Sequence, residues 1–302
     1  MAIHTEKSSF VTDEPGNAKP DDAGEAREVR MEQSVTEMDN LMNGTITQLF
    51  QRKSVRAFEP LPIDPAIRDL LFEAALQAPT AGNQTLYTIL DITDPVLKAE
   101  LAELCDHQPF IATAPLVLVF LADGRRWLGL YRAAGCEPRP QGPGDALLAM
   151  ADAVIAAQNM VVAAHSLGLG SCYIGDILEN CEQVRARLQL PDDVFPAAML
   201  VIGWPTAQQL ARRKPVRFAR EQIVCENTYR EATPDALRQM YLNRAEQARA
   251  ERNLSGHESA VPVDFDTQLR AFWTRKYESS FALEMNRSAA EYLKAFHVTE
   301  KG

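Results

Sequence analysis

The chain has 302 residues, of which 46% are hydrophobic and 24% charged, a composition typical of globular rather than disordered proteins. The net charge of −10 argues against a broad nucleic-acid-binding face and against anionic membranes as partners, because binding to phosphates needs clustered Lys and Arg. The five cysteines form no CxxC, as expected in a reducing cytosol, and the first thirty residues lack a signal peptide's apolar run. We therefore expect a cytoplasmic protein.

The amino-terminal part of the chain is acidic. Residues 1–40 contain ten acidic and four basic residues, and up to about residue 24 they lack periodic apolar positions, which predicts a mobile tail. From Met31 to Leu49, apolar residues recur at three- and four-residue steps. This spacing predicts an amphipathic helix that Asn43 and Gly44 can interrupt.

Helices and strands alternate irregularly after this segment. Asp64-Pro65 and Asp94-Pro95 each combine an N-cap residue with a proline in the first turn, and so predict the starts of two helices. The residues from Pro115 to Ala122 are nearly all apolar, which predicts a strand buried on both faces. The full set of predicted strands is 86–92, 115–122, 171–174 and 196–204, and the predicted helices are 66–78, 94–105, 146–167, 179–188 and most of the chain after 233, with loops at 135–144 and 254–262.

The longest apolar-rich stretch is 146–167. Asp152, Gln158, Asn159 and His165 interrupt it, and the cost of placing such groups in hydrocarbon argues against a membrane span. A helix that is apolar around most of its circumference has to be surrounded by protein, either the core or a second subunit.

Several familiar motifs fail. Gly170 to Gly175 has the glycine spacing of a phosphate loop, but Asp176 and Ile177 stand where Lys and Ser or Thr are required. The chain has no GxGxxG after a strand, no HExxH and no GxSxG, and its five histidines lack metal-ligand spacing. Hydrolase and metalloenzyme functions lose most of their support, and no metal site is expected.

Two cationic clusters lie far apart in the sequence. Arg52, Lys53 and Arg56 flank Ser54, whereas 212–220 contains five basic residues within nine positions. Each cluster alone is typical of a solvated surface. Together they could clamp one phosphate, with the hydroxyl of Ser54 and the basic side chains supplying hydrogen bonds.

Two segments of small residues accompany the clusters. Residues 78–83 (Ala-Pro-Thr-Ala-Gly-Asn) are either a simple turn or a wall against which a planar ring lies while Asn83 hydrogen-bonds to it. Residues 168–175 contain glycines that permit close backbone approach, or they form a tight connection from helix to strand.

Taken in chain order, the two cationic clusters and the two segments of small residues resemble the flavin-dependent nitroreductase family over about 41–229. The resemblance is greatest to its oxygen-insensitive NADPH nitroreductase and flavin reductase branch. Gln108-Pro109-Phe110-Ile111, Ile202-Gly203-Trp204-Pro205 and Lys214-Pro215-Val216-Arg217 strengthen the resemblance. It implies an α+β fold with a central mixed, largely antiparallel sheet flanked by helices, in a homodimer with a long buried interface helix. It also divides the chain into an acidic extension (1–40, mobile and then helical), an FMN-binding core (41–230) and a mostly helical carboxy-terminal extension (231–302).

The resemblance implies FMN as cofactor, NADPH or NADH as reductant, and no catalytic side chain, because the flavin carries the chemistry. Arg56 would sit at the pyrimidine end of the ring, where positive charge stabilises the anionic reduced flavin. The other implied contacts are Arg52, Lys53, Ser54, Lys214 and Arg217 to the phosphate and ribityl chain, Pro79, Thr80, Ala81 and Asn83 along the ring from the other subunit, Gln108 to the ribityl chain or ring edge, and Tyr173, Ile174 and Gly175 near flavin N5. Arg244 is a candidate for the phosphates of the nicotinamide cofactor.

The chain departs from the family pattern at Asp176, which follows Gly175 where relatives often have a second glycine. Asp176 either faces the ring or caps the next helix, and we favour the cap. The implied reaction passes hydride from NAD(P)H through the flavin to a nitroaromatic, quinone or flavin acceptor in two steps. A flavin-modifying or dehalogenating enzyme of the same fold and a non-catalytic flavin-binding regulatory protein remain alternatives. We expect the acceptor pocket to come from loops at 124–144 and after 233.

Overall fold

The computed structural model describes residues 41–253 and 264–297, and the chain divides into two units, 1–47 and 48–302. In the first unit, the side chain of Asn43 accepts a hydrogen bond from the backbone N–H of Ile46 (3.0 Å) and starts α2 (Gly44–Gln51). Met42 and Asn43 are not helical and Gly44 is the first residue of α2, so the interruption expected at Asn43-Gly44 lies one residue earlier, at Met42-Asn43. The tail and helix expected within 1–40 lie outside the described residues, and the three-part division of the chain stays a prediction.

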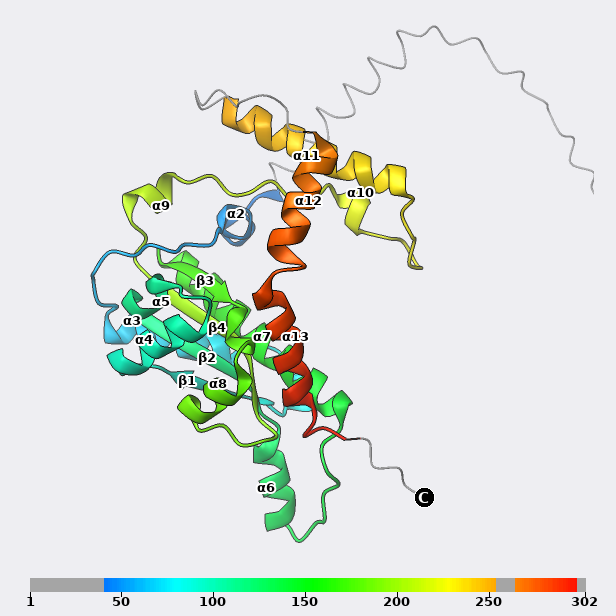
Figure 1. The fold of residues 1–302 in the computed structure, drawn as a ribbon. Helices are drawn as coiled ribbons and strands as arrows, with labels where there is room; N and C mark the ends of the chain where they lie inside the picture. Colours follow the sequence, from blue (N-terminus) through cyan, green and yellow to red (C-terminus); the bar gives the residue numbers. More distant parts are fainter. Residues whose placement is uncertain (1–40, 254–263, 298–302) are drawn as a thin grey trace, which may run out of the picture. The chain divides into compact units, whose positions relative to one another are not determined.

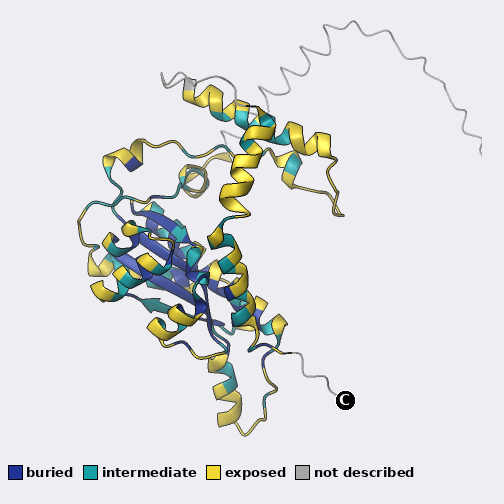
Figure 2. Cartoon of the chain, viewed as in Figure 1, coloured by how far each residue is buried: buried dark blue, intermediate teal, exposed yellow. Residues whose placement is uncertain are grey.

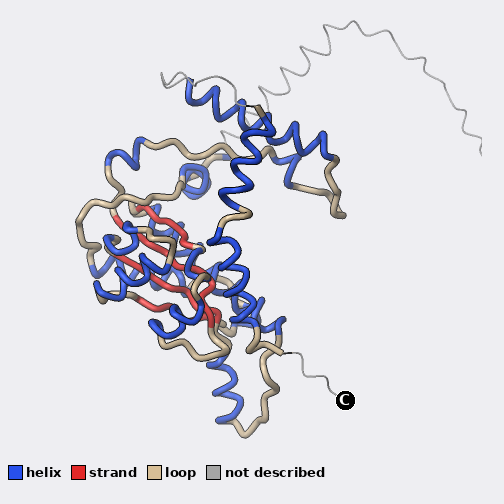
Figure 3. Tube along the Cα trace, in the orientation of Figure 1, coloured by secondary structure: helices blue, strands red, loops and turns tan. Residues whose placement is uncertain are grey.

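The core of the second unit is a four-stranded antiparallel sheet (Figures 1 and 3). Its strands are β1 (Tyr87–Asp91), β2 (Leu116–Ala122), β3 (Gly170–Ile174) and β4 (Phe195–Gly203), in the order β1-β2-β4-β3. A parallel bridge between Ser54 and Ser171 gives the sheet its mixed character. The predicted α+β class and all four predicted strands are confirmed.

Strand β2 shows how the sequence specifies the two layers around the sheet. Successive side chains of a strand point to opposite faces. Accordingly, Leu116, Leu118 and Phe120 belong to a core with α3 (Pro65–Leu76) and α7 (Pro143–Ser166). Val117, Val119 and Leu121 belong to a second core with α4 (Pro95–Leu104), α5 (Pro109–Thr113) and α8 (Cys181–Leu188). All seven residues of β2 are buried, as the apolar run predicts (Figure 2).

The helices begin where the capping residues predict. The carboxylate of Asp64 accepts from the N–H of Ala66 (2.8 Å), and that of Asp94 accepts from the N–H of Val96 (2.9 Å). The helices are α3 (Pro65–Leu76), α4 (Pro95–Leu104), α5 (Pro109–Thr113), α6 (Arg125–Ala133), α7 (Pro143–Ser166), α8 (Cys181–Leu188), α9 (Ala207–Ala211), α10 (Arg220–Ile223), α11 (Pro234–Asn253), α12 (Phe265–Lys276) and α13 (Ser280–Leu293), with 3₁₀ turns η1 (Ala81–Asn83) and η2 (Asp176–Leu178). The expectation of a loop over 124–144 was wrong in its first half, which is α6, and the loop expected at 254–262 lies outside the described residues.

Helix α7 lies against the sheet along one side. Ala153, Ala157 and Met160 are fully buried in the first core. Among the described residues, α7 is the one helix long and apolar enough to cross a membrane by length and composition, a property that buried core helices share. Its opposite side carries an apolar stripe that this single chain leaves exposed, comprising Leu147, Leu148, Val154 and Ile155. The expectation that protein surrounds α7 is met on one side only within one chain.

Helix α13 completes a third, smaller core. The ring of Tyr292, 1% exposed, packs 6.0 Å from that of Phe195 on β4. The hydroxyl of Ser288 accepts from the backbone N–H of Cys181 (3.0 Å), and Arg287 pairs with Glu182 (2.8 Å). Residues late in the chain are therefore part of the central fold.

Candidate functional site

The two cationic segments meet in space. Lys53 Nζ donates hydrogen bonds to the backbone oxygens of Leu210 (2.6 Å) and Arg212. Lys214 Nζ donates to the backbone oxygens of Leu49 (3.1 Å) and Phe50 (2.7 Å) in the last turn of α2. A lysine near a helix end stabilises carbonyls that have no partner within the helix. Each segment is therefore held by the other's backbone.

The pKa values of Lys214 and His165 are lowered by burial and then by the positive charge of the two cationic segments. The pKa of Lys214 is lowered by burial first, and then by Arg217 and Arg52. The pKa of His165, at the carboxyl end of α7, is lowered by burial and then by the charges of Arg52 and Lys214, with Lys53 adding to the effect. Like charges disfavour protonation of a neighbour, so these groups share one strongly positive region.

Arg52 has an unused hydrogen-bond donor in this region. Its Nη1 is buried and has no partner among the described residues. A buried donor without a partner costs about 1–3 kcal/mol, and phosphate oxygens are the preferred acceptors for a guanidinium group. The residues present therefore fit a phosphate group.

Segment 54–58 pairs with β3, an edge strand of the sheet, and with Pro205 just after β4. The N–H of Val55 donates to the carbonyl of Ser171 on β3 (2.9 Å), and the N–H of Arg56 donates to Oε1 of Gln209 (3.3 Å). A Cβ at Gly170 would lie 2.7–2.9 Å from the side chain of Val55, so glycine is required for this approach. The docking places the Ser54 hydroxyl beside the Cys172 thiol and brings the charges of Arg56 and Arg52 close to that thiol.

The loop at 79–86 is organised by a residue that the sequence interpretation had treated only as an interruption of α7. Asp152 is 3% exposed, and its carboxylate accepts from the hydroxyl of Thr80 and from the backbone N–H groups of Ala81 (2.9 Å) and Leu86 (3.2 Å). The Thr80 hydroxyl in turn accepts from the N–H of Thr85 (2.7 Å). In the sequence, the feature that could have indicated this role of Asp152 is a single acidic residue on the buried side of an otherwise apolar helix.

Arg52 and Gln108 both lie near the carboxyl end of β3, where Arg52 is close to Tyr173 and Gln108 donates to Asp176. Burial raises the pKa of Tyr173 to about 12 against the opposing charge of Arg52, and the Tyr173 hydroxyl donates to Oε1 of Gln158 (3.3 Å). Ile174 is 2% exposed, so its side chain belongs to the core, whereas Gly175 is exposed. The exposed backbone at Gly175 is the part of this turn open to a ligand.

Asp176 does not act as the predicted helix cap. It is the first residue of η2, which has no side-chain cap hydrogen bond. Its Oδ2 instead accepts from Nε2 of Gln108 (2.8 Å), which also donates to the carbonyl of Cys105 (2.8 Å). The amide of Gln108 therefore engages the carboxylate in place of the backbone N–H groups of the turn.

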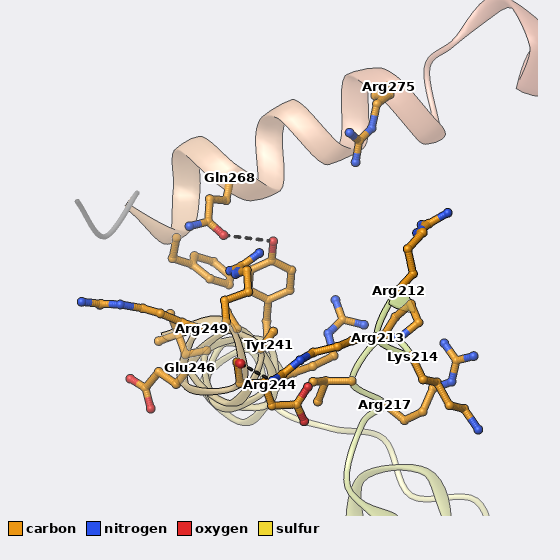
Figure 4. A pocket seen from close by; sticks show the side chains of 18 residues that line it. Arg212, Arg213, Lys214, Arg217, Tyr241, Arg244, Glu246, Arg249, Gln268 and Arg275 are labelled. Atoms are coloured by element: carbon orange, nitrogen blue, oxygen red, sulfur yellow. Dashed lines mark hydrogen bonds between the residues drawn. The ribbon is translucent and has the colours of Figure 1, made fainter. Parts of the chain in front are cut away.

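A cavity of about 1150 Å³ adjoins the second cationic segment (Figure 4). Its walls come from 212–217, α11 and α12, and of its eighteen lining residues eight are Arg or Lys and two are Glu. Arg244 lies in this wall with its guanidinium 3.8 Å from the ring centroid of Phe218, an arrangement that keeps the cation in place. The cavity suits a ligand with several negative charges.

The structure thus brings together Arg52, Lys53, Ser54, Arg56, Tyr173, Lys214 and Arg217. The ring-lining candidates Pro79, Thr80, Ala81 and Asn83 form a separate loop on α7, and in the described part of the chain no hydrogen bond or ion pair joins that loop to the cationic segments. Gln108 reaches the end of β3 through Asp176.

In this α+β fold, the cationic segments that converge near β3 are suited to a phosphorylated ligand. The family model "Nitroreductase family" matches residues 49–204, and the chain belongs to that family. It is 34% identical over 196 residues to an FMN reductase (NADPH) of Bacillus subtilis, covering 64% of this chain and 78% of that protein. It is 35% identical over 189 residues to an oxygen-insensitive NADPH nitroreductase of Salmonella typhimurium, covering 62% and 75%. A solved nitroreductase structure from B. subtilis superposes with a TM-score of 0.70 at 28% identity, covering 83% of this chain and all of that one.

Proposed function

We propose that this chain is an NAD(P)H-dependent oxidoreductase that uses FMN and acts in the cytoplasm. Family membership and the relatives named for FMN reduction and nitroreduction support the activity. The observation that carries the cofactor assignment is the convergence of two cationic segments around the unpartnered Nη1 of Arg52. When bound, FMN supplies hydride acceptance from NAD(P)H and two-electron transfer to a second substrate.

The side chains hold and orient the cofactor. Each lysine ammonium has three N–H donors, and Lys53 and Lys214 each use two on backbone carbonyls, so one remains for a phosphate oxygen. Arg52, Ser54 and Arg217 add further donors to the phosphate and ribityl chain. Arg56 supplies positive charge at the pyrimidine end of the ring. No side chain is needed as an acid or base.

The remaining assignments concern the assembly and the second substrate. We assign a homodimer joined through the exposed stripe of α7, so that Pro79, Thr80, Ala81 and Asn83 line the ring bound by the partner subunit. Gly175, Tyr173 and Ile174 form the turn beside flavin N5. The acceptor is a small molecule such as a nitroaromatic, quinone or free flavin, and it enters after the oxidised nicotinamide has left, in a two-step mechanism.

Stopped-flow absorbance tests the function directly. The purified protein should be yellow, lose its flavin colour on mixing with NADPH, and regain it when a nitroaromatic or quinone is added without oxygen. A bound flavin that neither nicotinamide reduces would instead support the non-catalytic alternative.

Arg52→Ala is expected to weaken FMN binding by about 10- to 100-fold, because hydrogen bonds to charged groups contribute roughly 1.5–3 kcal/mol. Free FMN is measured by its fluorescence after dilution of the holoenzyme. Arg187→Ala is the matched control, since Arg187 is half exposed and pairs with Glu100 away from the site. An unchanged FMN dissociation constant in Arg52→Ala would remove Arg52 from the cofactor site.

The cationic cavity supports NADPH over NADH as reductant, because the 2′-phosphate adds a dianion that its arginines attract. Arg244→Gln is expected to raise the KM for NADPH by about tenfold and to leave the KM for NADH nearly unchanged. Arg270→Gln on α12, whose side chain is exposed and outside the cavity lining, is the control. Equal effects on the two nicotinamides would contradict the assignment.

A further inference from the structure

The amide group of Gln108 is fixed in one orientation. Both of its N–H donors are directed at atoms that only accept hydrogen bonds, the carboxylate oxygen of Asp176 and the backbone oxygen of Cys105, each at 2.8 Å. A rotated amide would place its own oxygen against these two oxygens. The carbonyl oxygen of Gln108 is therefore the atom left for a ligand.

Asp176 is itself paired with a second carboxyl group. Glu179 follows η2, is 4% exposed, and has an Oε1 with no partner among the described residues. Its carboxyl group lies within hydrogen-bonding reach of Asp176, and burial followed by the charge of Asp176 raises its pKa to about 7. A protonated Glu179 can donate its O–H to Asp176, whereas two ionised carboxylates in this position repel each other.

Two further carboxylates near Glu179 make its ionisation less favourable. Asp106, beyond the end of α4, and Glu284 on α13 both raise the pKa of Glu179. Arg287 is engaged by Glu284 and by Glu182 at 2.8 Å. The buried thiol of Cys105 has a raised pKa, due to burial and then Asp176 and Glu179, and so stays neutral.

We propose that Asp176 and Glu179, with Glu179 donating a hydrogen bond to Asp176, act as a positioning pair for Gln108, so that the amide offers only its oxygen to the edge of the FMN ring. The oxidised ring edge carries one N–H donor, at N3, beside several acceptors, and an oxygen can pair only with that donor. The inference rests on the proposed function, because it takes the ligand at Gln108 to be FMN.

The proton on Glu179 makes FMN affinity depend on pH. Below about pH 7 Glu179 keeps its proton, donates to Asp176, and the pair holds Gln108. As the pH rises past the pKa of Glu179, the second negative charge pushes the two carboxylates apart and releases the amide. FMN affinity should fall over the same range.

The test measures the FMN dissociation constant of the full-length holoenzyme by dilution and recovery of free FMN fluorescence between pH 6.5 and 8.5. The wild-type dissociation constant is divided by that of Glu179→Gln at each pH, which cancels the titration of the FMN phosphate. Because the glutamine amide can donate to Asp176 at every pH, this ratio should rise about fivefold or more across the range. Glu73→Gln, at an exposed position on α3, should follow the wild type.

Asp176→Asn provides a second measurement that needs no titration. An asparagine can present its own N–H groups to Gln108, so the glutamine amide is free to rotate, and FMN binding at pH 6.5 should weaken about fivefold. A ratio that stays constant with pH, or an Asp176→Asn variant with wild-type affinity, overturns the inference while leaving the proposed function intact. Failure of the wild-type protein to bind FMN at any pH overturns both.

Discussion

Replacing Asp152 by alanine is expected to lower the free energy of unfolding by roughly 3–5 kcal/mol and to weaken FMN binding. The carboxylate is the common acceptor for Thr80, Ala81 and Leu86. Its removal leaves these three donors without a partner and leaves an empty space where the side chain was. The loop at 79–86 would then lose the position in which we propose that it lines the flavin ring. Urea unfolding followed by circular dichroism measures the stability, and fluorescence measures the released FMN.

Two variants make the Asp152 prediction specific. Asp152→Asn keeps the shape but can accept with only one oxygen, so its loss of stability should fall between those of the wild type and Asp152→Ala. Asp69→Ala removes an exposed carboxylate on α3 and should change stability by less than about 0.5 kcal/mol. Wild-type unfolding in Asp152→Ala would show that the loop does not depend on this carboxylate.

Ile155→Lys is expected to convert the proposed homodimer into a monomer, raising the dimer dissociation constant by about 1000-fold or more. Ile155 belongs to the exposed stripe of α7, and a twofold interface would bury two unpaired ammonium groups there, each at a cost of several kcal/mol. Analytical ultracentrifugation measures the assembly. FMN should dissociate as well, because the ring would lose the loop contributed by the partner subunit.

The control for this interface is Val96→Lys. Val96 is also an exposed apolar residue, 64% accessible, but it lies at the start of α4 on the opposite side of the sheet. It should leave the dimer intact. A wild-type protein that sediments as a monomer with FMN bound would contradict the assignment of α7 as the interface.

Local sequence patterns predicted those parts of the fold that local physics determines. The apolar run of β2 was recognisable because a strand buried on both faces needs apolar residues throughout. The starts of α3 and α4 were recognisable because each has an Asp cap followed by a proline in the first turn. Helix α6 was missed although Trp127, Leu128 and Tyr131 recur at helical spacing, because the segment is short, contains Gly129 and has no buried residue. Its Trp127 is held by a hydrogen bond from the indole N–H to the carbonyl of Gln84 (2.6 Å), a contact that depends on the fold.

The candidate site was predictable in its members but not in its contacts. The two basic segments are visible as residues, yet the use of Lys53 and Lys214 to bind each other's backbone carbonyls depends on where α2 ends. The roles of Asp152 and Asp176 likewise depend on partners more than sixty residues away in the chain. For Asp176 the preferred sequence interpretation, a helix cap, was wrong because the nearby amide of Gln108 competes for the carboxylate.

The position of α13 has a consequence for biosynthesis. Strand β4 emerges from the ribosome well before Tyr292, whose ring closes over Phe195 and lies 5.2 Å beneath the guanidinium carbon of Arg185. Until then, the apolar surface around Phe195 has no native cover, and exposed surface of this kind is what chaperones recognise and what drives aggregation. The native cover over Phe195 therefore forms only after α13 has been synthesised, and ribosome-stalled chains that lack α13 should remain sensitive to protease around β4.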